Sequence, residues 1–199
     1  MVRRWKGGSH ENVKGQMTMP KSPTLYLTCG LPGSGKTTLA KQLEQSAGAI
    51  RLTGDDWLQA LFPEMTTDEA EKGPLRAKIE KLQWQMALRA LELDCNVIVD
   101  WGIWSRKERD DLRNAALRVG AKVILCLLDP PLAELWERVS RRNEERPFGA
   151  FQMTEADLIR WSLLFERPTA DELSQYYMWG GINNDVKLRK TSKRKRSSK

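Results

Sequence analysis

The stretch Gly30-Leu31-Pro32-Gly33-Ser34-Gly35-Lys36-Thr37 decides how the rest of the sequence is interpreted. It fits the spacing G-x-x-x-x-G-K-[ST] at every fixed position. A short apolar run, residues 24–29, precedes it, and a run with helical periodicity, residues 36–45, follows it and closes at Gly48. A strand, this loop and a helix in succession predict a Walker A phosphate-binding loop. The alternative is an ordinary glycine-rich turn, which would not require a match at every fixed position.

The chemistry of this stretch explains its composition. Glycines at positions 30, 33 and 35 permit backbone angles that let successive N–H groups turn toward phosphate oxygens at a helix N-terminus. We expect Lys36 to bridge the β- and γ-phosphates of ATP, and the Thr37 hydroxyl to hold Mg²⁺. All eight residues and the following Thr38 are therefore candidate nucleotide contacts, although Thr38 could serve the helix alone.

Outward from this stretch, further apolar runs at residues 49–52, 96–100 and 123–128 alternate with helical segments. This order predicts right-handed crossovers and a parallel sheet covered on both faces. The expected fold is an α/β P-loop NTPase, a three-layer sandwich with four to five parallel strands. One long helical segment carries an apolar stripe that we expect to face the core, formed by Leu75, Ile79, Leu82, Met86, Ala90 and Leu93.

The charge of the chain is concentrated at its ends. The formal net charge is +7, of which residues 1–21 carry +4 and residues 187–199 carry +8, so the residues between them carry −5. We expect a flexible segment at 1–22, a kinase domain at 23–175 and a basic, disordered tail at 176–199. Nucleic acid could contact this tail, whose other interpretation is a solvated end. No apolar segment suggests a membrane span or a secretion signal, and we expect a cytoplasmic protein.

Cysteine and histidine usage narrows the chemistry. Cys29, Cys95 and Cys126 lie in apolar runs, are odd in number and form no C-x-x-C pair, which predicts reduced thiols in the core. The only histidine is His10, in the N-terminal segment. The domain therefore has no imidazole for acid–base work, and a carboxylate is the most plausible general base.

Three aspartates follow predicted strands. Asp55 and Asp56 come after the second strand, and Asp100 ends the third, which places them at the sheet edge that carries the phosphate loop. Phosphoryl transfer needs a group that takes or orients the acceptor proton and ligands for the metal. We assign the base to Asp55 and metal binding to Asp100 with Thr37. The alternatives are that Asp55 or Asp56 caps a helix, and that Asp100 merely ends a strand.

Four arginines, at positions 138, 141, 142 and 146, crowd a helix end before Pro147. We interpret them as a lid over the triphosphate, with Arg138 and Arg142 as candidate catalytic residues, while a solvated helix face is the other interpretation. Tryptophans at positions 57, 101 and 104 follow the aspartates closely. They could form walls for an acceptor or pack in the core.

Residues 24–173 resemble small P-loop kinases of the zeta-toxin and polynucleotide-kinase-like group. The phosphate loop with Thr38, Asp55-Asp56-Trp57, Val99-Asp100-Trp101-Gly102 and residues 138–143 carry the resemblance. In polynucleotide 5′-hydroxyl kinases of this group the first aspartate after the second strand is the general base, which implies that role for Asp55. An arginine often follows three residues later. Here that position is Leu58, which favours a small-molecule acceptor.

Three hypotheses follow. The leading one is an ATP- and Mg²⁺-dependent kinase that transfers the γ-phosphate to a hydroxyl of a small molecule, such as a nucleoside, sugar or antibiotic. The first alternative is a polynucleotide 5′-hydroxyl kinase. The second is a nucleotide-dependent binding or switch protein with slow ATPase activity. No pattern in the sequence indicates an oligomeric state or a preference for ATP over GTP.

Overall fold

The computed structural model describes residues 22–63, 69–145 and 152–178, in which β-strands and α-helices alternate along most of the chain. The elements are β1 (Thr24–Cys29), α1 (Lys36–Ala47), β2 (Ile50–Leu52), α2 (Gly54–Leu61), α3 (Glu69–Glu92), β3 (Val97–Val99), α4 (Arg106–Arg118), β4 (Lys122–Leu127), α5 (Leu132–Glu145), α6 (Glu155–Leu164), α7 (Ala170–Leu173) and β5 (Tyr177–Met178).

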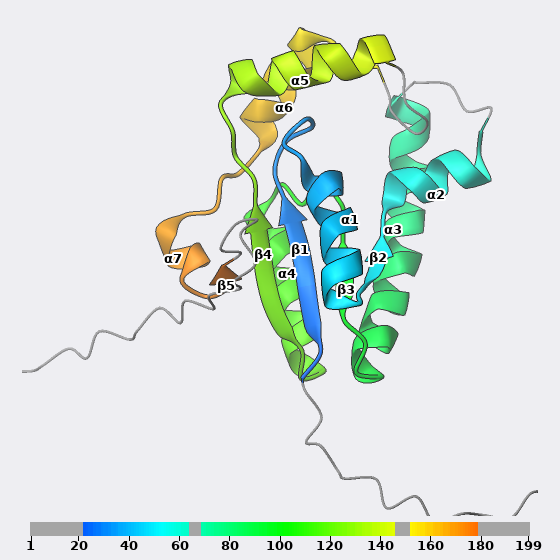
Figure 1. Cartoon of the computed structure of the whole chain (residues 1–199), viewed down its shortest axis with the longest axis vertical. Coiled ribbons are helices and arrows are strands. Elements are labelled where there is room, and N and C mark those ends of the chain that lie inside the picture. The colour runs from blue at the N-terminus through cyan, green and yellow to red at the C-terminus, as the bar shows by residue number, and fades with distance from the viewer. Residues whose placement is uncertain (1–21, 64–68, 146–151, 179–199) are drawn as a thin grey trace, which may run out of the picture.

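The five strands form one parallel sheet in the order β2-β3-β1-β4-β5. Because β1 occupies the centre and its neighbours on both sides come later in the chain, the connections run to opposite sides of β1. The point between them, at the carboxyl ends of the strands, is where ligands bind in open α/β sheets. Figure 1 shows α5 lying across this end of the sheet, above the loop that joins β1 to α1.

Both faces of the sheet are buried, as the continuous apolar runs of the strands predict. Side chains alternate along β1: Leu25 and Leu27 pack with residues of α3, α4 and α6, whereas Tyr26 packs with residues of α1. The three-layer P-loop sandwich predicted from the sequence is confirmed. Among the helices of the described ranges, none is both long and apolar enough to cross a membrane.

Local sequence signals account for several boundaries. Gly48 adopts a left-handed conformation at the end of α1, and Ser105 caps α4 by accepting a hydrogen bond from the backbone N–H of Glu108. Thr154 and Asp157 form a reciprocal capping box at the start of α6. Gly48 is where the sequence predicted the first helix to close.

The apolar stripe expected to bury α3 is wrong for three of its six members, and of the six only Ile79 is fully in the core. Leu82, Met86 and Leu93 are 57%, 51% and 58% exposed, and the helix buries the neighbouring face instead, formed by Ile79, Gln83, Ala87 and Leu91. The buried glutamine, Gln83, explains the error, because a polar residue in the middle of the true core face weakens its periodicity.

Two further expectations need correction. Cys29 and Cys126 are buried thiols, but Cys95 is exposed, because it lies in the turn between α3 and β3 rather than within a strand. The tail predicted from residue 176 begins inside the sheet, since β5 pairs with β4 through Tyr177 and Met178. Backbone pairing needs no side-chain periodicity, which is why so short a strand escaped notice. The rest of the predicted tail, residues 179–199, lies outside the described residues. So does the N-terminal segment 1–21, which contains His10.

Candidate active site

The loop between β1 and α1 has the backbone of a phosphate-binding loop. Gly30, Gly33 and Gly35 have φ angles of 150°, 80° and 96°, which other residues rarely adopt. A Cβ atom at position 30 would lie 2.2 Å from the carbonyl oxygen of Leu128, and one at position 33 would lie 2.9 Å from a methyl carbon of Val139. The loop is thus enclosed by the end of β4 and by α5, and glycine is required for steric reasons as well as for its φ angles.

Lys36 bends back over this loop. Its Nζ donates hydrogen bonds to the carbonyl oxygens of Gly30 and Leu31, each at 2.9 Å. Burial lowers the pKa of Lys36 to about 8, although the negative charges of Asp100 and Asp55 oppose the shift. A desolvated ammonium that only carbonyl oxygens satisfy would gain from a nearby phosphate, which offers stronger acceptors and a compensating charge.

Asp100 lies beside Thr37 at the end of β3. Its side chain is buried, and its Oδ1 accepts a hydrogen bond from the Thr28 hydroxyl at 3.3 Å. Burial raises the pKa of Asp100, and the nearby Thr37 hydroxyl and the charges of Lys36 and Arg51 counteract this. Its Oδ2 atom is buried without a hydrogen-bond partner, with Arg51 Nη1 at 3.7 Å.

An orphaned carboxylate oxygen next to a threonine hydroxyl fits a Mg²⁺ ion, which keeps several waters and binds through one or two protein oxygens plus phosphate. Within the part of the chain that the structure describes, no three His, Cys, Asp or Glu side chains gather as an all-protein metal cluster. The two candidate ligands, Thr37 and Asp100, therefore suit a metal that arrives with a nucleotide.

Asp55 and Asp56 lie in the first turn of α2, whose N-cap residue is Thr53. The alternative that one of these aspartates caps the helix is therefore wrong. Asp56 turns toward Arg51, at 3.0 Å from its Nη2, while Asp55 Oδ1 lies 3.2 Å from Arg76 Nε. The Asp55 side chain remains 51% exposed, so its second oxygen is accessible to a ligand.

The lid helix α5 brings two of its arginines toward the site. Arg138 Nη1 donates a weak hydrogen bond to the Gly33 carbonyl oxygen at 3.4 Å and also pairs with Glu134. Arg142 donates to the sulfur of Met153 at 3.4 Å, and burial lowers its pKa, a shift that the negative charge of Asp55 opposes.

The other arginines of the lid differ from these two. Arg141 is exposed and lies 3.8 Å from Glu137, as expected for a solvated helix face. Arg146 and the following Pro147 lie outside the described residues.

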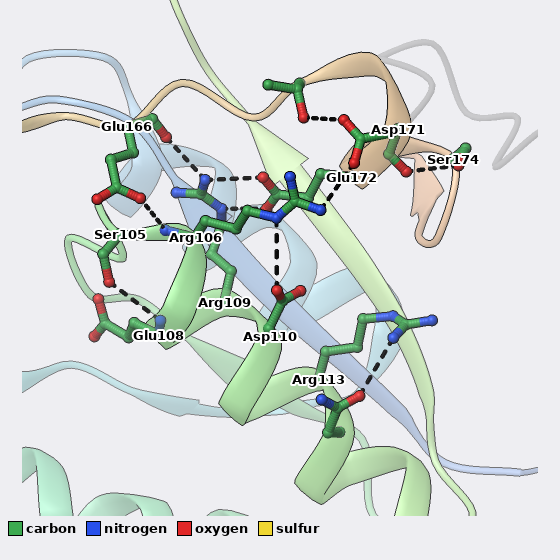
Figure 2. Close-up of polar contacts among 12 residues, drawn as sticks. Ser105, Arg106, Glu108, Arg109, Asp110, Arg113, Glu166, Asp171, Glu172 and Ser174 are labelled. Carbon is green, nitrogen blue, oxygen red and sulfur yellow. Dashed lines mark hydrogen bonds and ion pairs between the residues drawn. The ribbon is translucent and has the colours of Figure 1, made fainter.

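Arg109, a fully buried residue of α4, holds the loop that follows Asp100. Its guanidinium donates to both carboxylate oxygens of Glu172, at 2.5 and 3.0 Å, and to the carbonyl oxygens of Trp104 and Glu166 at 2.9 and 2.8 Å. Figure 2 shows this buried pair beside exposed contacts of Arg106 and Arg113 on the same helix. Arg109 thereby joins the β3–α4 loop to the segment around α7.

Several polar residues of the site escaped the sequence analysis. Arg51 contacts Glu44, Asp56 and Asp100, and Gln83 accepts a hydrogen bond from the indole of Trp101. Trp101 is thus a buried structural residue rather than an acceptor wall, and Trp57 and Trp104 pack against the core. No motif marks Gln83 or the contact of Arg51 with Asp100. The partners in these contacts, Thr53 and Trp101 for Gln83 and Asp100 for Arg51, are distant in sequence.

A family model and several solved structures are similar to this chain. A family model described as an AAA domain, AAA_33, matches residues 25–168. The fold is similar to that of a candidate kinase from Chloroflexus aurantiacus J-10-fl, with 20% identity, a TM-score of 0.57 and coverage of 74% of this chain and 77% of that chain. It is similar to a gluconokinase from Sinorhizobium meliloti 1021, with 20% identity, a TM-score of 0.51 and coverage of 75% and 78%.

A chain of the Pnkp1/Rnl/Hen1 RNA repair complex is also similar, with 24% identity, a TM-score of 0.59 and coverage of 71% of this chain and 43% of that chain. The comparison with curated proteins found no match. At these identities the likeness to solved structures concerns the fold.

Proposed function

The chain belongs to the AAA domain family AAA_33, and from this premise we propose that it is an ATP- and Mg²⁺-dependent phosphotransferase whose acceptor is a hydroxyl of a small molecule. One observation carries the proposal: the glycines of the loop between β1 and α1 have the φ angles of a phosphate-binding loop, with Lys36 folded over that loop and the half-exposed carboxylate of Asp55 near enough to act on the charge of Lys36. A carboxylate near the lysine that would hold the γ-phosphate is where a kinase needs its base.

The proposed reaction follows from these positions. The loop N–H groups and Lys36 bind the β- and γ-phosphates, and Arg142 approaches the γ-phosphate from the lid. Asp55 accepts the proton of the acceptor hydroxyl as its oxygen bonds to the γ-phosphorus, and the bond from phosphorus to the bridging oxygen breaks to release ADP. Mg²⁺ held by Thr37 and Asp100 would neutralise charge on the phosphates. The protein mainly positions the reactants and balances charge.

The acceptor side favours a small molecule over a polynucleotide. Leu58 is 2% exposed and packs in the core. It occupies the position at which polynucleotide kinases of the group that this chain resembles often carry an arginine. It offers no cation to an acceptor phosphate. The cation that pairs with Asp55 is Arg76, which lies on α3 rather than on α2, so the acceptor contacts differ from that pattern.

The test uses γ-labelled ATP with Mg²⁺ and a pooled panel of nucleosides, sugars, antibiotics and 5′-hydroxyl oligonucleotides. Asp55→Asn should lose label transfer by at least about 100-fold, the lower end of the range for a general base. Asp56→Asn is the matched control: it changes the next residue, whose carboxylate turns to Arg51, and it should retain most of the transfer.

Label in a small acceptor that depends on Asp55 supports the proposal. Label in oligonucleotides would instead establish the polynucleotide kinase, and label only in inorganic phosphate would favour the switch protein with slow ATPase activity.

A further inference from the structure

Gln83 is a fully buried amide in the middle of α3. Its Nε2 donates a hydrogen bond to the carbonyl oxygen of Thr53 at 3.1 Å, and its Oε1 accepts one from the indole Nε1 of Trp101 at 2.9 Å. Both partners are themselves buried. One side chain therefore spans two loops that are far apart in sequence, and both ends of its amide are used.

These two loops carry the two carboxylates of the site. Thr53 is the N-cap of α2, and Asp55 lies in the first turn of that helix. Trp101 directly follows Asp100. The Gln83 amide is thus a fully buried polar connection between the segment of the proposed base and the segment of the proposed metal ligand, in addition to Arg51 of β2, which contacts Asp56 and Asp100.

The surroundings of Gln83 strengthen this connection. Three positions of α3, spaced by one turn, meet three consecutive residues: Gln83 bonds to Thr53, Glu80 packs on Gly54, and Arg76 pairs with Asp55. A Cβ atom on residue 54 would lie 3.3 Å from the Glu80 side chain, which shows how closely α3 approaches. The start of α2 is therefore held along its length by α3.

The chemistry of the position points the same way. The buried residues on the same face of α3, namely Ile79, Ala87 and Leu91, are apolar. A buried amide contributes little net stability over an apolar residue of similar volume, and it becomes costly when a partner is lost. The two hydrogen bonds explain why a glutamine is present here, because they fix the positions of the two loops relative to each other.

We propose that Gln83 is a positioning residue that holds the Asp55-bearing turn of α2 in register with the Asp100-bearing loop, so that base and metal ligand stay aligned on one phosphate. The inference rests on the proposed function of Asp55 and Asp100. A misplacement of about 1 Å can cost on the order of 100-fold in rate, which sets the scale of the expected effect.

The main test variant is Gln83→Met, which keeps the volume and removes both hydrogen bonds. Gln85→Met is the matched control, since Gln85 lies on the exposed side of the same helix. We expect Gln83→Met to lower kcat for transfer by about 10- to 100-fold. We expect an unchanged KM for ATP, because the phosphate loop is not touched. A purely structural residue would lower the melting temperature without this split.

A second measurement does not depend on activity. Hydrogen exchange of the backbone at residues 53–58, the start of α2, should be faster in Gln83→Met than in Gln85→Met. Exchange in the strands of the sheet should be the same in both variants. Trp101→Phe, which removes only the indole donor, should give part of the same effect. The double variant should be no worse than the more affected single variant if both act through one connection.

Two results would overturn the inference: unchanged exchange at residues 53–58 in Gln83→Met, or a fall in melting temperature with kcat and KM both as in Gln85→Met. Failure of the proposed function is a separate outcome. If the wild-type protein transfers no phosphate to any acceptor, the kinase proposal falls, and the exchange rates alone decide whether Gln83 couples the two loops.

Discussion

Replacing Arg109 by methionine tests whether the loop after Asp100 depends on the buried ion pair beneath it. Arg109 and Glu172 are 0% and 1% exposed in their side chains, and their nearest atoms are 2.5 Å apart. The methionine keeps much of the volume but leaves the Glu172 carboxylate and the Glu166 carbonyl oxygen without their donors, whereas the Trp104 carbonyl keeps the backbone N–H of Glu166. Breaking a buried pair from one side leaves an uncompensated charge, which costs about 3 to 5 kcal/mol of unfolding free energy.

A matched control lies one turn earlier on the same helix. Arg106 pairs with Asp171 at 2.8 Å, with side chains 41% and 66% exposed, so the pair is hydrated and screened. Arg106→Met should leave the free energy of unfolding nearly unchanged. Removing both charges with Arg109→Met and Glu172→Leu should restore part of the loss, because no charge then stays buried alone.

Urea unfolding followed by circular dichroism gives the free energies, and a thermal scan should show Arg109→Met melting about 6 to 20 °C below wild type. A loss in Arg109→Met as small as that in Arg106→Met would refute the argument that this pair is dry. A double variant less stable than Arg109→Met would refute the argument that the buried charge of Glu172 causes the loss.

Three further predictions concern titration and the phosphate loop. Burial raises the pKa of Glu80 to about 7, so its contribution to stability is fully present below about pH 4.5 and lost as the pH rises through 7. Glu80→Gln should therefore stabilise the protein at pH 8 by on the order of 1 to 2 kcal/mol after solvent screening, and by less at pH 5, as urea unfolding at both pH values would show. The pKa of Lys36 is lowered to about 8, so its ammonium loses its proton between pH 7 and pH 9, and the Kd for ATP should rise roughly tenfold over this range. Lys36→Met should remove this pH dependence. Calorimetry measures both effects, and a flat profile in wild type would contradict the prediction. Gly30→Ala should abolish ATP binding, since its Cβ would lie 2.2 Å from the Leu128 carbonyl oxygen, whereas Gly73→Ala, with open space around it, should bind ATP normally.

The backbone of the phosphate loop could be predicted from the sequence because the residues that form it are contiguous. The phosphate loop occupies residues 30–37, its glycines are needed for local backbone angles, and the adjoining strand and helix have clear periods. Asp100 could be placed because parallel strands end at a common edge, so its position follows from topology. Local signals of this kind require no knowledge of distant contacts.

The face that α3 buries could not be predicted in the same way. Two adjacent stripes on this helix carry apolar residues, and the true core face is interrupted by Gln83. Periodicity ranks the faces of a helix by their apolar content, whereas the structure chooses the face that also satisfies the carbonyl of Thr53 and the indole of Trp101. The polar residue that misled the pattern is the one that orients the helix.

The acceptor half of the site is built differently from the nucleotide half, and this limits what a family match can convey. Asp55 is held by Arg76 from another helix, and the adjoining loops are held by Gln83 and Arg109, across 18 to 63 residues of sequence. Substitutions at such positions can reshape the acceptor contacts while the phosphate loop stays intact. Proteins that share this loop can therefore share nucleotide chemistry and differ in acceptor. Under the proposed function the acceptor binds around Asp55, whose half-exposed carboxylate and partner Arg76 do not belong to the P-loop motif.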